Sequence, residues 1–72
     1  MSANGQILLI GFGNMGQALA RGWLAHGREA ASVRVVEAAD AARAAAVELG
    51  LEAVAEIDKT EQGADVIVLA VK

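Results

Sequence analysis

The feature that most constrains this chain is the hexapeptide GFGNMG at residues 11–16, with glycine in its first, third and sixth positions. Four consecutive apolar residues, Ile7–Ile10, come just before it and suit a strand of a parallel sheet that is covered on both faces. Residues 14–25 have the apolar spacing of a helix. A glycine-rich turn between a strand and a helix predicts the start of a strand–helix–strand unit.

The remainder of the chain continues this alternation. We predict strands over residues 6–10, 32–36, 51–55 and 65–71, helices over 14–25 and 40–49, and a single helical turn over 58–63. Gly27 and Gly50 follow the two helices as C-terminal stops, and Asp40 is the predicted N-cap of the second helix. The alternation predicts an α/β fold, an incomplete Rossmann-type parallel sheet of about four strands with flanking helices.

One side of the first helix is expected to pack on this sheet. Its apolar side recurs at four-residue steps: Met15, Leu19 and Trp23. A neighbouring side consists of small residues that could approach the sheet closely: Ala18, Gly22 and Ala25.

Each glycine of the hexapeptide has a physical role in such a turn. Gly11 permits the tight turn off the strand, Gly13 lacks a Cβ and lets a pyrophosphate approach the backbone, and Gly16 lets the helix lie close to the strand. The amino terminus of the helix offers unpaired N–H groups and a partial positive charge to phosphates. The context therefore favours a dinucleotide ligand over a purely structural turn.

An acidic residue closes the second predicted strand. Glu37 stands 21 residues after Gly16, where a carboxylate can accept hydrogen bonds from both hydroxyls of an adenosine ribose. The same carboxylate would repel the 2′-phosphate of NADP, and Arg43 is the nearest downstream arginine. Glu37 therefore favours NAD, and the alternative is that it is only a solvated strand end.

Composition and charge exclude several classes of protein. Nine acidic and six scattered basic residues give a net charge of -3, so a nucleic acid is not an expected partner. With no cysteine and a single histidine, His26, we expect neither a disulfide framework nor a metal site. The apolar runs are too short for a membrane span and the start of the chain is not a secretory signal, so a soluble cytoplasmic protein is expected.

Two other kinds of nucleotide-binding loop are also rich in glycine. The P-loop needs a glycine and lysine followed by serine or threonine, which this chain lacks. Methyltransferases use a related glycine-rich turn with an acidic residue at the end of the second strand. A domain that binds S-adenosylmethionine is therefore an alternative.

Together with the hexapeptide, the pair Gly22-Trp23 and the segment ADVIVLAVK at residues 64–72 make the chain resemble the amino-terminal domain of pyrroline-5-carboxylate reductase. The resemblance covers essentially all 72 residues, and the pair Asn14-Met15 is its most specific part. Related domains share much of it, namely those of 3-hydroxyisobutyrate, 6-phosphogluconate and prephenate dehydrogenases and of deazaflavin-dependent NADP reductases.

The resemblance implies an NAD(P)-dependent oxidoreductase of proline biosynthesis, in which hydride from NAD(P)H reduces the C=N bond of pyrroline-5-carboxylate to give L-proline. It implies that the pyrophosphate and nicotinamide side of the cofactor is lined by Phe12, Gly13, Asn14 and Met15. It also implies that three residues pass beneath the cofactor: Ala70, Val71 and Lys72. The candidate cofactor-binding residues are these seven with Gly11, Gly16 and Glu37.

In that family the substrate site and dimer interface lie in a helical carboxy-terminal domain, so no catalytic residue carries over. We expect residues 1–72 to be the amino-terminal part of a dinucleotide-binding domain, with the substrate domain absent and a homo-oligomer formed through it. Many members prefer NADPH and carry a small polar residue where this chain has Glu37. The alternatives are a 3-hydroxyacid dehydrogenase-type domain, a deazaflavin-dependent NADP reductase domain, and a nucleotide sensor without turnover.

Overall fold

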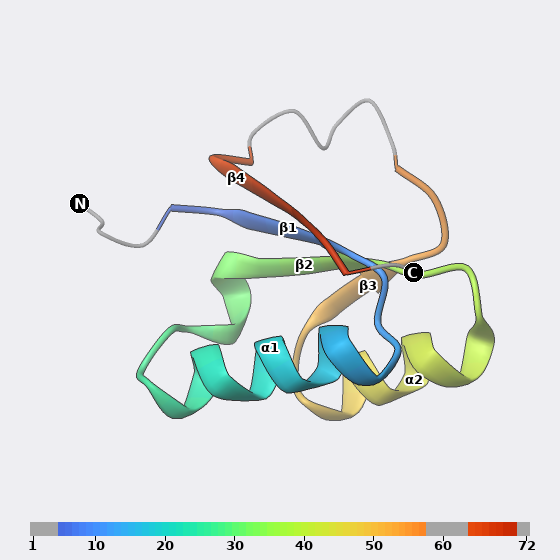
Figure 1. Ribbon diagram of the computed structural model, residues 1–72, viewed down its shortest axis with the longest axis horizontal. Coiled ribbons are helices and arrows are strands. Elements are labelled where there is room, and N and C mark those ends of the chain that lie inside the picture. Colours follow the sequence, from blue (N-terminus) through green and yellow to red (C-terminus); the bar gives the residue numbers. More distant parts are fainter. Residues whose placement is uncertain (1–4, 58–63, 71–72) are drawn as a thin grey trace.

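In the computed structural model, which describes residues 5–57 and 64–70, strands and helices alternate along the chain (Figure 1). Their order is β1 (Ile7–Ile10), α1 (Asn14–Ala25), the 3-10 turn η1 (Ala30–Ser32), β2 (Val33–Val36), α2 (Asp40–Glu48), β3 (Glu52–Val54) and β4 (Val66–Leu69). The strands pair in parallel in the order β3-β2-β1-β4. The predicted α/β fold, a Rossmann-like sheet, is confirmed.

The chain changes direction across the sheet at β1. From β1 it runs outward to β2 and β3, and β4 then pairs with the other side of β1. Ile10 is level with Val36 on one side and with Leu69 on the other, so these three strands end at the same edge. Open α/β sheets bind ligands outside the carboxyl ends of their strands at such a reversal of strand order.

The core fills the layer between the sheet and the two helices, which lie on the same face of the sheet (Figure 1). Alternate residues of the central strands point into it, and Leu9, Val33 and Val35 are at most 1% exposed. Ala20 of α1 and Ala46 of α2 are also fully buried, and their small side chains let the helices approach the sheet. Each large aliphatic side chain buried here contributes roughly 1.5–3 kcal/mol to folding.

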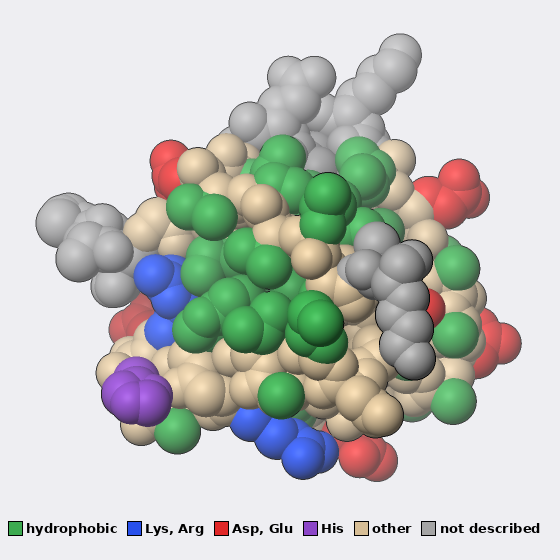
Figure 2. Space-filling view, viewed as in Figure 1, with side chains coloured by type: hydrophobic (Ala, Val, Ile, Leu, Met, Phe, Trp, Pro, Cys, Tyr) green, Lys and Arg blue, Asp and Glu red, His purple; other side chains and the backbone are tan. Residues whose placement is uncertain are grey.

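The opposite face of the sheet is apolar along β1 and β4, whereas Arg34 of β2 and Glu52 of β3 form an ion pair on it. Leu8 is buried on it, but Ile67 and Leu69 of the edge strand β4 are 60% and 67% exposed. Neither α1 nor α2 covers this face (Figure 1). Figure 2 shows the molecule from the same direction as Figure 1, with hydrophobic side chains gathered in the middle of the view and charged ones mostly around them.

Both helices end as their glycines predict. In each, the residue after the glycine donates its N–H to a carbonyl five residues back, from Arg28 to Trp23 O at 3.0 Å and from Leu51 to Ala46 O at 3.0 Å. The glycines themselves have positive φ angles, which completes a Schellman motif at each helix end.

The start of α2 and one predicted turn differ from expectation. The N-cap is Ala39 and not Asp40, and Asp40 is instead the first helical residue, where its carboxylate binds Arg43 one turn later. An acidic residue in the first turn still complements the positive end of the helix. The helical turn predicted over 58–63 lies outside the described residues.

The buried side of α1 is also rotated from its predicted position. Gly16 and Ala20 are its buried residues, with Leu19 and Trp23 packed partly against the core, whereas Met15 is 60% exposed. Ala18 and Ala25, two members of the predicted small-residue side, are exposed as well. The close contact of Gly16 with the turn after β1 fixes this rotation, because it brings the line Gly16–Ala20 inward.

Candidate dinucleotide-binding site

Two of the three motif glycines are required by the backbone and its packing. Gly11 is buried with a φ of 100°, a backbone conformation that residues other than glycine rarely adopt. Its N–H donates to Val36 O at 2.9 Å. At Gly16, an added Cβ would lie 2.2 Å from Gly11 O. The predicted tight turn at Gly11 and close helix approach at Gly16 are therefore both present.

Phe12 is fixed by its side chain, its carbonyl and its N–H. Its side chain is 0% exposed and belongs to the core, so it fills the loop and does not cover a ligand. Its carbonyl accepts a hydrogen bond from Gln17 Nε2 at 3.3 Å, and its N–H donates to Glu37 Oε1 at 2.7 Å. Any contact of Phe12 with a cofactor would therefore have to involve its backbone.

The next three residues, Gly13, Asn14 and Met15, are exposed at the start of α1. Gly13 is the N-cap, no side chain caps the helix, and no acidic residue lies in its first turn. The first intrahelical bond is donated by Gln17 N–H to Gly13 O at 2.9 Å, so the preceding N–H groups of the turn have no helical acceptor. A Cβ on Gly13 would meet nothing within 4 Å. This surface can accept an anion such as a phosphate.

Glu37 lies across the glycine loop at the end of β2. Its N–H donates to Val54 O at 2.8 Å, which continues the sheet pairing for one residue. Its carboxylate accepts two backbone hydrogen bonds, from Phe12 N–H at 2.7 Å on Oε1 and from Ala39 N–H at 2.8 Å on Oε2. Each oxygen keeps a further lone pair, so the carboxylate can still accept two ribose hydroxyls.

These contacts keep Glu37 ionised. The N–H groups of Ala39 and Phe12 lower the pKa of the carboxyl from its ordinary value of 4.5, and the charge of Arg43 lowers it further, against the opposing effect of burial. A fixed negative charge therefore stands beside the glycine loop at neutral pH.

Arg43 supports the same region from α2. Its Nη1 donates to the carbonyls of Glu37 and Ala38, both at 3.1 Å, and its Nη2 pairs with the carboxylate of Asp40. Its guanidinium is thus bound to the loop between β2 and α2. The sequence shows Arg43 only as the nearest arginine downstream of Glu37, and it carries no local signal of these bonds.

Ala70 is the one member of the predicted trio after β4 that the structure describes. It is buried, and its N–H donates to Ile10 O at 2.8 Å, which brings it beside the residue that precedes Gly11. Val71 and Lys72 lie outside the described residues, so their predicted place beneath a cofactor stays a prediction.

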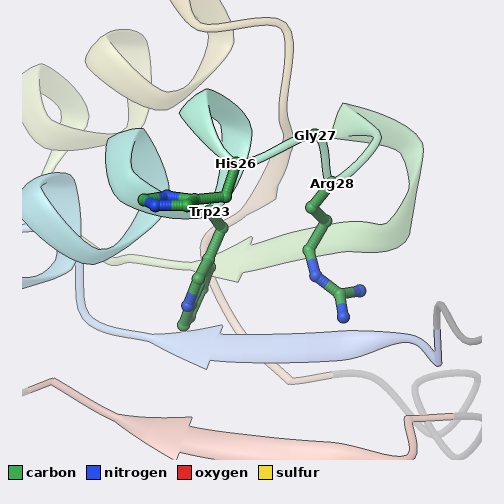
Figure 3. Close-up of a pocket in the computed structure, with 4 residues that line it drawn as sticks. All are labelled: Trp23, His26, Gly27 and Arg28. Carbon is green, nitrogen blue, oxygen red and sulfur yellow. The ribbon is translucent and has the colours of Figure 1, made fainter.

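A cavity of about 240 Å³ lies at the other end of α1, lined by Trp23, His26, Gly27 and Arg28. Figure 3 shows Trp23 and Arg28 reaching toward β1. The Arg28 Nη1 donates to Gly5 O at 2.8 Å and to Ser32 Oγ at 3.2 Å, and His26 Nδ1 lies 2.8 Å from Gly22 O. These bonds give Arg28 and His26 partners within the protein.

The described parts of the chain contain no helix long and apolar enough to cross a membrane. Within residues 5–57 and 64–70 there is also no cluster of three or more His, Cys, Asp or Glu side chains that could hold a metal ion.

Comparison with known proteins adds a family to this geometry. Residues 6–72 match the model of a family described as "NADP oxidoreductase coenzyme F420-dependent". No curated protein and no solved structure matches the chain. Pyrroline-5-carboxylate reductases share this family through their amino-terminal domains, but the match does not distinguish among its enzymes. Because the match spans nearly the whole chain, the protein belongs to this family of NAD(P)-binding oxidoreductase domains.

Proposed function

We propose that this chain is the dinucleotide-binding part of a pyrroline-5-carboxylate reductase that prefers NADH to NADPH. The observation that carries the proposal is the position of the ionised Glu37 carboxylate across the loop from the exposed, uncapped first turn of α1. The first turn supplies donors for phosphates and Glu37 supplies acceptors for a ribose. The substrate rests on the resemblance of residues 11–16 and 64–72 to that enzyme.

The chain's own residues would bind and orient the cofactor. Backbone N–H groups at Gly13, Asn14 and Met15 would hold the pyrophosphate, Gly11 and Gly16 would shape the turn, and residues 70–72 would pass beneath the ribose and nicotinamide. Bound NADH supplies the hydride that reduces the C=N bond. No residue of this chain is proposed as catalytic, because the enzyme it resembles holds its substrate in a helical carboxy-terminal domain, through which it also dimerises.

The preference for NADH follows from the charges around Glu37. A 2′-phosphate would meet the carboxylate, which carries a full negative charge at neutral pH. Arg43, whose charge acts on Glu37, already binds two carbonyls and Asp40. The family description names NADP, so this chain would depart from the cofactor of that description.

The test is a turnover assay on the full-length protein with pyrroline-5-carboxylate, followed by the absorbance of the reduced nicotinamide. We expect turnover with both cofactors and a higher kcat/KM with NADH. Glu37→Gln should lower kcat/KM for NADH by about tenfold and for NADPH by less, because the lost charge no longer repels the 2′-phosphate.

Glu48→Gln is the matched control, since Glu48 is an exposed carboxylate at the end of α2, away from the loop. An equal loss for both cofactors in the Glu37 variant would contradict the ribose contact. No turnover of pyrroline-5-carboxylate by a protein that still binds NADH would contradict the substrate.

A second candidate is an oxidoreductase that transfers hydride between NADP and the deazaflavin coenzyme F420, because the description of the matching family names that pair. The same protein would then reduce the coenzyme with NADPH and leave pyrroline-5-carboxylate unchanged. Assaying the two substrates in parallel decides between the candidates.

A further inference from the structure

The carboxylate of Glu37 joins two loops that are distant in the sequence. Oε1 accepts from the N–H of Phe12 in the glycine loop, and Oε2 accepts from the N–H of Ala39 just before α2. Phe12 and Glu37 are 25 residues apart, so this bond fixes the loop after β1 against the loop after β2.

The bond to Phe12 satisfies a donor that has no other acceptor among the described residues. Phe12 is buried, and its N–H follows directly on Gly11, whose own N–H is used by Val36 O. Removing the carboxylate would leave the Phe12 N–H inside the protein without a partner, which is unfavourable. The backbone at Phe12 would then be expected to shift. Such a shift would also displace Gly13 and the first turn of α1, which come directly after it.

We propose that Glu37 is a positioning residue for the phosphate-binding part of the site: its carboxylate holds the glycine loop in the shape that presents the first turn of α1. This rests on the proposed dinucleotide site and adds a second role to the ribose contact. One carboxylate then both selects the cofactor and orders the loop. A small residue at position 37 would admit a 2′-phosphate but would also loosen the loop that holds the pyrophosphate.

The two bonds predict how substitutions differ. Gln keeps the length of the side chain and one acceptor oxygen, so Glu37→Gln can keep the bond to Phe12 or to Ala39 but not both. Asp keeps the charge but is shorter by one methylene, so Glu37→Asp cannot span both loops. Glu37→Ala loses both bonds. Order in the loop should therefore be highest in the native protein, intermediate in Glu37→Gln and Glu37→Asp, and lowest in Glu37→Ala.

The first measurement is amide hydrogen exchange at Phe12 in the full-length protein without any nucleotide. Glu37→Ala should speed exchange at Phe12 by about tenfold, and Glu37→Gln by less, with the amides of β3 unchanged. Glu48→Gln should leave Phe12 at its native rate. If Glu37→Ala does not fold, Glu37→Gln carries the comparison. Native exchange at Phe12 in both variants would overturn the proposal, whether or not the protein binds NAD.

The second measurement separates loop order from ribose recognition. The ligand is an NAD analogue whose adenosine ribose lacks both hydroxyls, so Glu37 has no ribose group to bind. Glu37→Ala should still weaken this analogue about fivefold by calorimetry, because the loop is disordered. Loss of a negative charge alone would strengthen binding of the anionic analogue. Equal or tighter binding to Glu37→Ala, beside weaker binding of NAD itself, would confine Glu37 to the ribose and overturn the positioning role.

Discussion

The glycine loop has a closed half and an open half, which differ although both are rich in glycine. In the closed half, Gly11 and Phe12 are buried and Gly16 leaves no room for a side chain beside Gly11 O. In the open half, Gly13 is exposed and a Cβ on it would meet nothing. The closed half is explained by packing alone. Packing does not explain why Gly13 lacks a side chain in the open half. A site that receives a pyrophosphate at this backbone does explain it.

The largest expected effect comes from filling the closed half. In Gly16→Ala the new Cβ would start 2.2 Å from a backbone oxygen, so α1 or the turn after β1 must shift. We expect a loss of about 2–3 kcal/mol in the free energy of unfolding, as in other overpacked sites. Urea denaturation of the full-length protein measures it. Native stability in this variant would show that the closed half has more freedom than its geometry indicates.

A side chain placed in the open half should weaken cofactor binding and have little effect on stability. Gly13→Val places its side chain where a pyrophosphate would approach, so we expect affinity for NADH to fall at least about tenfold. The free energy of unfolding should fall by no more than about 1 kcal/mol, because valine is a poorer N-cap than glycine but meets no neighbour. Calorimetry with NADH checks the affinity. Unchanged affinity would remove the phosphates from this half of the loop.

The sequence predicts the fold and the roles of Gly11 and Gly16 better than the rotation of α1. Strand and helix positions follow from apolar runs and from Gly27 and Gly50, because each of these acts through local backbone geometry. The roles of Gly11 and Gly16 follow from the same local rules. The rotation of α1 was missed because it depends on one contact, that of Gly16 with the Gly11 carbonyl, and side-chain periodicity does not report glycine contacts.

The contacts of the site could be predicted only in part, for a similar reason. Position in the strand pattern identified Glu37 as a candidate, but its bonds to Phe12 and Ala39 depend on how two loops meet in space. Phe12 was ambiguous in the sequence because an aromatic residue in a loop can face a ligand or the core. Only its packing against the buried residues decides that it faces the core.

The pH dependence of the free energy of unfolding should also distinguish the two halves, because Glu37 is bonded to the closed half. Its pKa is lower in the folded protein than its ordinary value of 4.5, so its contribution to stability is complete above that value. The contribution disappears as the pH falls through the lowered pKa of the folded state. The stability difference between the native protein and Glu37→Gln should therefore shrink as the pH falls below about 4.5.

Urea midpoints at several pH values measure this difference, and Glu48→Gln serves as the control. A difference that stays constant over the whole range would mean that the carboxylate is not held by the two N–H groups.

The smallest effect is expected at a glycine that belongs to neither half. Gly22 lies inside α1, and a Cβ there would also meet nothing within 4 Å, as at Gly13. Gly22→Ala should raise the free energy of unfolding by about 0.5–1 kcal/mol, because alanine favours a helix interior, and leave NADH affinity unchanged. This result would show that a side chain added in open space does not by itself weaken binding. The loss in Gly13→Val would then come from the position of Gly13 at the start of α1. If Gly22→Ala weakened NADH binding as much as Gly13→Val, the loss in both variants would reflect a disturbed α1 and not an occupied phosphate site.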